Sequence, residues 1–146
     1  MESASNTGAA RFSPEGDSLA YVSDETGQQE VYIRRYPSAE RGQQMSRNGG
    51  REPVWSGDGT TLFYRSGDRM MAADIMTKPA FRSGPPVEVW NRPYFSLGMF
   101  GVHNYDVAGD GRFLMLRVRD DAAPTAARLN IVLNWLEELQ ARGVIR

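Results

Sequence analysis

The chain has 146 residues, of which 40% are apolar and 10% aromatic, enough for the core of one domain. Seventeen basic and eighteen acidic residues leave a formal net charge of -1, so no overall field would attract nucleic acid or an anionic membrane. The absence of cysteine excludes disulfides, thiolate metal sites and cysteine nucleophiles. Without an apolar signal region or a run of about 20 apolar residues, we expect a soluble chain with no visible signal peptide, cytoplasmic by default.

The first predicted unit follows residues 1–8, a small and polar N-terminal segment. A Pro-Glu-Gly-Asp turn at 14–17 favours a hairpin, because proline fixes φ and glycine accepts a positive φ. The strands expected on either side of this turn and after it are 9–13, 19–23 and 30–34. A short polar strand within 41–47 completes the unit, since the outermost strand of a sheet faces water on one side.

The second predicted unit repeats this order after Asn-Gly-Gly at 48–50. Its first turn is Gly-Asp-Gly at 57–59, another sequence that accommodates a tight turn. The strands expected here are 52–56, 61–65, 69–75 and 87–90.

The third predicted unit has strands at 105–108, 112–119 and 129–133 around a Gly-Asp-Gly turn. We expect 112–119 to be buried on both faces, since apolar side chains occur at successive positions from 113 to 116. Residues 135–142 change to helical spacing and Gly143 follows them, which predicts one short C-terminal helix.

The three units share an internal pattern as well as an order of elements. Each has a turn that ends in a glycine, and the three glycines are Gly16, Gly59 and Gly111. A leucine follows three residues later in each unit, at Leu19, Leu62 and Leu114. The spacing from Gly16 to Gly59 and from Gly59 to Gly111 is typical of propeller blades of three to four strands. We expect these leucines, with Phe12 and Trp55, to be among the most buried side chains.

Two stretches resemble TolB-type β-propeller repeats: Arg-Phe-Ser-Pro-Glu-Gly-Asp-Ser-Leu-Ala-Tyr-Val-Ser-Asp at 11–24 and Glu-Pro-Val-Trp-Ser-Gly-Asp-Gly at 52–59. Residues 130–139 resemble the closing segment of such propellers where they follow bacterial serine/threonine protein kinase domains. The resemblance implies an all-β fold of three blades of the four-stranded type, about 9–50, 51–93 and 103–135. This is half of the six-bladed propeller usual in the family, with the helix 135–142 added and no kinase domain.

Candidate catalytic chemistry is sparse. His103 lies near Asp106 in the sequence, yet there is no Gly-x-Ser-x-Gly nucleophile elbow and no spacing typical of a triad. The Gly-Asp-Gly sequences do not continue as metal or phosphate loops, and they are explained as turns. We therefore expect no catalytic residue, no metal and no cofactor, with His103 in a loop or at an interface.

The segment 94–100 is the one aromatic feature that the repeat does not require. It is explained either as a lid over the edge of a blade or as a surface for a partner. The candidate partner or ligand surface consists of Tyr94, Phe95, Met99, Phe100 and His103.

These observations favour a non-enzymatic propeller scaffold that binds a protein or small ligand at the central pore or on the segment 94–100. Because three blades cannot close a ring, we expect a head-to-tail homodimer in which residues 1–8 supply a closing strand against the third blade of the other chain. The alternative is a detached sensor domain of a kinase-like bacterial signalling protein. A hydrolase with a gating propeller would need residues that this chain does not contain. We expect neither a nucleic-acid partner nor a membrane span.

Overall fold

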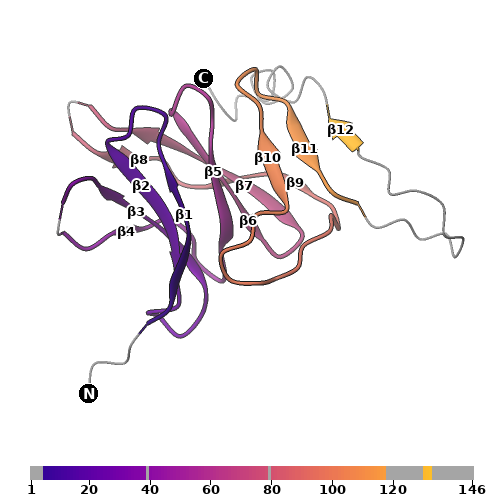
Figure 1. Ribbon diagram of the computed structural model, residues 1–146, viewed down its shortest axis with the longest axis horizontal. Coiled ribbons are helices and arrows are strands. Elements are labelled where there is room, and N and C mark those ends of the chain that lie inside the picture. Colours follow the sequence, from indigo (N-terminus) through magenta and orange to yellow (C-terminus); the bar gives the residue numbers. More distant parts are fainter. Residues whose placement is uncertain (1–4, 39, 79, 118–129, 133–146) are drawn as a thin grey trace, which may run out of the picture.

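The computed structural model describes residues 5–38, 40–78, 80–117 and 130–132, and these form three antiparallel sheets. The sheets follow one another in sequence order and stand side by side, each presenting a face to the next (Figure 1). This is the arrangement of consecutive propeller blades, so the all-β prediction is confirmed. The helix expected at 135–142 lies outside the described residues.

Blade 1 has four strands in sequential order, β1 Thr7–Phe12, β2 Ser18–Ser23, β3 Glu30–Arg35 and β4 Gln43–Gln44. The first strand begins earlier than expected, because β1 begins at Thr7, which pairs with Ser23, and Gly8 pairs with Val22. Asn6 is also held within this blade, since its backbone and side-chain amides donate to the Asp24 carboxylate. Residues 6–8 thus belong to blade 1, and a contact of residues 1–8 with another chain stays a prediction.

Blade 2 has the strands β5 Arg51–Trp55, β6 Thr61–Ser66, β7 Arg69–Met76, β8 Arg82–Ser83 and β9 Val87–Asn91. Its long third strand β7 pairs with β8 near one end and with β9 near the other, so two short strands share the outer edge. The described part of blade 3 contains β10 Tyr105–Val107, β11 Phe113–Met115 and β12 Asn130–Val132.

A bulge in the first strand is part of the repeat. Ala9 in β1 and Glu52 in β5 occupy equivalent positions and have φ angles of 51° and 57°, where the pairing register of each strand shifts. Neither residue is glycine, so this left-handed conformation has no local sequence signal. The innermost strands of the three blades, β1, β5 and β10, lie next to one another on the side of the molecule seen in Figure 1.

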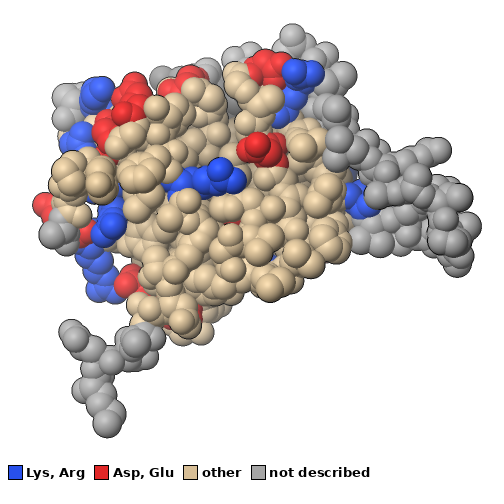
Figure 2. All heavy atoms as spheres, in the orientation of Figure 1, with Lys and Arg blue, Asp and Glu red and all other residues tan. Residues whose placement is uncertain are grey.

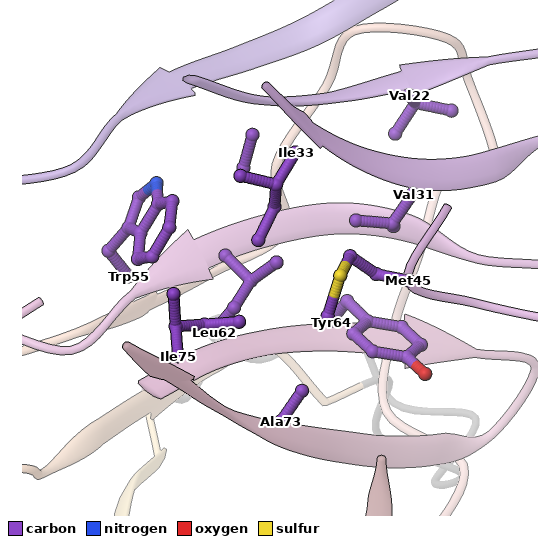
Figure 3. Packing of buried hydrophobic residues seen from close by; sticks show 10 residues of the cluster. Val22, Val31, Ile33, Met45, Trp55, Leu62, Tyr64, Ala73 and Ile75 are labelled. Carbon is purple, nitrogen blue, oxygen red and sulfur yellow. The ribbon is translucent and has the colours of Figure 1, made fainter. Parts of the chain in front are cut away.

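The apolar core lies between the blades. The junction of blades 1 and 2 is formed by Ala20, Val22, Val31, Ile33 and Met45 on one side and Trp55, Leu62, Tyr64, Ala73 and Ile75 on the other (Figure 3). The junction of blades 2 and 3 is formed by Val54, Phe63, Met70, Ala72, Val89 and Trp90 with Tyr105, Phe113 and Met115. Each blade therefore has a front face toward the preceding blade and a back face toward the next.

The core prediction is right for Trp55 and Leu62, both buried in the first junction, and wrong for Phe12 and Leu114. Leu19 is partly buried. Phe12 occupies the position of Trp55, but it lies on the front face of blade 1, where the described residues provide no preceding blade.

The error at Leu114 has a different cause, which is the length of the hairpin turn. In blade 2 Trp55 pairs with Leu62, whereas in blade 3 Val107 pairs with Phe113, so the third turn is shorter by one residue. Phe113 takes the inward position of Leu62, and Leu114 points to the opposite face. The expectation that residues 112–119 are buried on both faces is accordingly wrong at Leu114 and Leu116, which are exposed.

Candidate functional site

The predicted candidate surface lies on the segment from Asn91 to Tyr105, which returns from the outer edge of blade 2 to the first strand of blade 3. Buried Arg65 donates hydrogen bonds to the carbonyl oxygens of Tyr94 and Phe95, each at 3.0 Å. The Phe95 amide in turn donates to the Leu116 carbonyl at 2.8 Å. One guanidinium, with its planar set of donors, thus fixes the start of the segment against blade 2.

The middle of this segment is held by the buried carboxylate of Glu52. The carboxylate accepts a hydrogen bond from the Ser96 hydroxyl at 2.6 Å, and it accepts the backbone and side-chain amides of Asn104 at 3.2 and 3.1 Å. The Tyr105 hydroxyl donates to the Glu52 carbonyl at 2.8 Å, and burial together with the Glu52 charge raises the pKa of this phenol well above its ordinary value. Three donors compensate the removal of the carboxylate from water.

The far end of the segment reaches blade 1. A Cβ atom at Gly8 would stand 2.9 Å from the ring of Phe100, so glycine is needed there for the ring to pack against β1. Phe100 also packs on the core of the first junction, and Tyr94 stacks edge-on against Trp90 at 6.3 Å between ring centroids. The side chains of Phe100, Tyr94 and Trp90 therefore contribute to the packing of the blades.

His103 is half-buried, and its Nε2 lies 3.0 Å from the Pro53 carbonyl oxygen. Because a carbonyl only accepts, Nε2 carries the proton in this contact. Burial lowers the pKa of His103 from its ordinary 6.5, and the nearby Arg11 charge lowers it further. The geometry is that of a neutral histidine bonded to the backbone, with no hydroxyl nucleophile in hydrogen-bond contact among the described residues.

Met99 differs from the other four candidate residues because its side chain is 61% exposed. Leu97, two residues earlier, is also exposed. The structure therefore places Tyr94, Phe95, Phe100 and His103 in internal contacts and leaves Met99 on an outward tip.

The front face of blade 1 is an aromatic surface that sequence reasoning missed. Phe12 and Tyr36 are 52% and 51% exposed, and their rings meet edge to face with centroids 5.1 Å apart. Next to them the partly buried Tyr21 stacks on the buried Tyr32 at 5.6 Å, and the Arg34 guanidinium lies 5.9 Å from the Tyr21 ring centroid.

The repeat shows what such a face does elsewhere in the chain. Phe12 is equivalent to Trp55. Tyr36 is equivalent to Ile75, because each of these two residues stands two positions after the residue that pairs with the repeat leucine of its own blade. Trp55 and Ile75 are only 6% and 5% exposed, because blade 1 covers them. Equivalent residues are thus buried on the front face of blade 2 and half exposed on the front face of blade 1. The front face of blade 1 is therefore a junction surface without a neighbour in the described chain.

The back face of blade 3 is the second face that no described blade covers. Leu114 and Leu116 are exposed there on the side opposite Phe113 and Met115. A hollow of about 230 Å³ adjoins Leu114, and its lining residues are Asp106, Ala108, Arg112, Phe113 and Leu114. Its lining combines the apolar Ala108, Phe113 and Leu114 with the charged Asp106 and Arg112.

A larger and more polar groove, of about 700 Å³, lies between the turns of blades 1 and 2 and the outer end of β7. Glu15, Asp17, Asp58 and Asp74 line it together with Lys78 and Arg82. Much of this charge is already used, because Lys78 pairs with Glu15 at 3.0 Å and Asp58 accepts hydrogen bonds from Ser56 and Thr60. The groove is open, and charged side chains of both signs line it together with apolar ones such as Ile75 and Met76.

The surface over the innermost strands is mostly uncharged, with one basic and one acidic group of atoms near its middle (Figure 2). Among the described residues no three His, Asp or Glu side chains are grouped so that they could hold a metal ion. Nor does the described part of the chain contain a helix long and apolar enough to cross a membrane.

Comparison with known proteins supports the fold assignment. No protein-family model and no curated protein sequence matches the chain. The crystal structure of TolB from Acinetobacter baumannii superimposes with a TM-score of 0.55 at 18% sequence identity. The match covers 85% of this chain but only 29% of TolB, so the chain spans less than a third of that structure. The three sheets therefore have the fold of consecutive blades of a TolB-like β-propeller.

Proposed function

We propose that this chain is a non-enzymatic β-propeller scaffold whose free blade faces are its interaction surfaces. The observation that carries the proposal is the front face of blade 1, where Phe12 and Tyr36 are half exposed although the equivalent Trp55 and Ile75 are buried. Burial of apolar area contributes roughly 25 cal/mol per Å², so a surface built to the junction pattern gains free energy when a complementary face covers it.

The partner that this reasoning favours is a second copy of the chain. Three blades leave two complementary faces, one at each end, and a head-to-tail contact repeated by a two-fold operation closes into a ring. Two copies would give six blades in such a ring. Each junction would resemble a blade contact, apolar at its centre and larger than about 1,000 Å² in total.

Sedimentation equilibrium across nanomolar to high micromolar concentration tests this proposal. We expect a mass that rises from one chain to two, and a dissociation constant that increases at least tenfold in Phe12→Ser. The matched control is Met76→Ser, which removes a side chain of similar exposure, 53%, from the outer end of blade 2. A mass of one chain throughout would refute the ring, and so would equal effects of the two substitutions.

A second candidate, a sensor domain of a kinase-like bacterial signalling protein, rests on the sequence of residues 130–139, most of which lie outside the described part. Reading the coding sequence upstream of Met1 tests it. A kinase reading frame joined in phase would favour the sensor, and its absence would remove the basis for that alternative.

A partner at the Leu97 and Met99 tip remains a proposal of the same scaffold class, tested by Met99→Ser in a binding assay with any partner identified.

A further inference from the structure

The two junctions inside the chain follow one positional rule. Trp55 of blade 2 lies over the first strand of blade 1, and its indole Nε1 donates to the Arg11 carbonyl at 3.1 Å. Val107 occupies the position of Trp55 in blade 3, and it packs against the cluster that contains Val54, the equivalent of Arg11. The hydrogen bond fixes this offset of one position in the first junction, and in the second junction the same two positions belong to one apolar cluster.

The rule can be extended to a blade that would precede blade 1. Phe12 is the equivalent of Trp55 and Val107, and Asp106 is the equivalent of Arg11 and Val54 in blade 3. If blade 3 of a second copy preceded blade 1, Phe12 would lie against Asp106. Asp106 pairs with Leu114 across β10 and β11, and both line the hollow of about 230 Å³. Extending this offset thus leads to the hollow beside Leu114 on the back face of blade 3.

We propose that Phe12 of one copy inserts into the Asp106–Leu114 hollow of a second copy, in a head-to-tail register. This rests on the self-association proposed above and names the contact that makes it. The aromatic ring fills the hollow against Ala108, Phe113 and Leu114, between the charged Asp106 and Arg112, and the Leu114 and Leu116 side chains cover Tyr36. Phe12 becomes the anchor of the junction, in the position that Trp55 has within the chain.

Charge and turn geometry support the same register. The front face of blade 1 carries Arg34, whose Nε is buried without a hydrogen-bond partner in the described structure, and the back face of blade 3 carries the Asp106 carboxylate. Within the chain the turns of neighbouring blades also touch, since a Cβ atom at Gly57 would stand 2.7 Å from the Gly109 Cα atom. Gly109 has open space on its own exposed side, and the register places Pro14 of the other copy there.

Engineered cysteines test the register directly, because the chain has no native cysteine. A disulfide forms only where Cβ atoms approach to about 3.5–4.5 Å. We expect the double variant Phe12→Cys with Asp106→Cys to give a covalent dimer under mild oxidation, and each single variant to remain one chain on a non-reducing gel. A mixture of the two single variants, carrying different tags, should give the covalent mixed dimer. Gln44→Cys, on the outer strand of blade 1, serves as the exposed control and should not cross-link.

The possible failures separate the register from self-association. A covalent dimer of Phe12→Cys alone would show two front faces in contact and overturn the register, although the chain would still dimerise. The register would also be overturned if the protein has the mass of a dimer but neither double variant cross-links. The two double variants are Phe12→Cys with Asp106→Cys and Pro14→Cys with Gly109→Cys. A mass of one chain for the unmodified protein would refute the proposed function and this contact together. Circular dichroism confirms the fold of each variant, since the five cysteine positions are on turns, blade faces or the exposed outer strand β4.

Discussion

The free energy of unfolding should respond very differently to the same substitution at two equivalent leucines. Leu62 is fully buried between blades 1 and 2, whereas Leu114, its counterpart in the repeat, is 37% exposed on the back face of blade 3. Truncation of a fully buried leucine loses the transfer free energy of three carbon atoms and leaves a cavity, which together cost about 2–5 kcal/mol. Leu114→Ala leaves no enclosed cavity, and we expect a cost of about 1 kcal/mol or less.

Urea denaturation followed by tryptophan fluorescence measures this difference, since Trp55 packs in the same cluster as Leu62. With a slope of about 1–3 kcal/mol per M, Leu62→Ala should lower the midpoint by roughly 1–2 M and Leu114→Ala by a few tenths. The measurement belongs at a concentration low enough to keep the chain monomeric, so that the proposed junction does not contribute. Equal shifts for the two variants would refute both the assignment of the faces and the shorter third turn.

Three further outcomes follow from the described contacts. Glu52→Gln keeps the shape of the buried side chain but replaces an acceptor with a donor, and the poorly matched hydrogen bonds should cost about 1–3 kcal/mol in chemical denaturation. Gly57→Ala places a Cβ atom against the backbone of Gly109 and should lower the unfolding midpoint, whereas Gly109→Ala enters open space and should change it little. His103 has a folded-state pKa below its ordinary 6.5, so its contribution to stability is present above pH 6.5 and is lost as pH falls through the lower folded value. His103→Asn should therefore flatten the decrease in melting temperature below pH 6.5, and an unchanged pH profile would contradict the burial of that ring.

Strands and blade order could be predicted from the sequence because each is encoded locally. Turn residues such as Pro14 and Gly59 fix the hairpins, and alternating apolar residues in the strands give two faces to each blade. The bulges could not be predicted, because Ala9 and Glu52 adopt a left-handed conformation without glycine.

The candidate surface was predicted only in outline for a similar reason. The sequence identifies 94–100 as an aromatic insertion, but its contacts depend on Arg65 and Glu52, which lie about 30 and 44 residues away along the chain. Both are charged residues that hydropathy places on the surface, and both are buried. Their burial is explained only when the carbonyl and amide groups of the segment are seen to pair with them.

The exposed aromatic face was missed because repeat equivalence alone treats every blade as an internal one. Phe12 matches Trp55 in sequence, and its exposure depends on whether another blade precedes it, which no local pattern encodes. At the other end of the chain, the third turn is one residue shorter than the equivalent turn of blade 2, and this changes which residues of β11 face outward. By moving Phe113 into the junction it turns Leu114 outward beside Asp106, and so it creates the apolar wall of the hollow. Restoring the longer turn by inserting one residue between Gly109 and Arg112 should therefore reverse the faces of β11, expose Phe113, and abolish self-association if the hollow receives Phe12. Dimers that survive such an insertion with unchanged affinity would place the contact elsewhere.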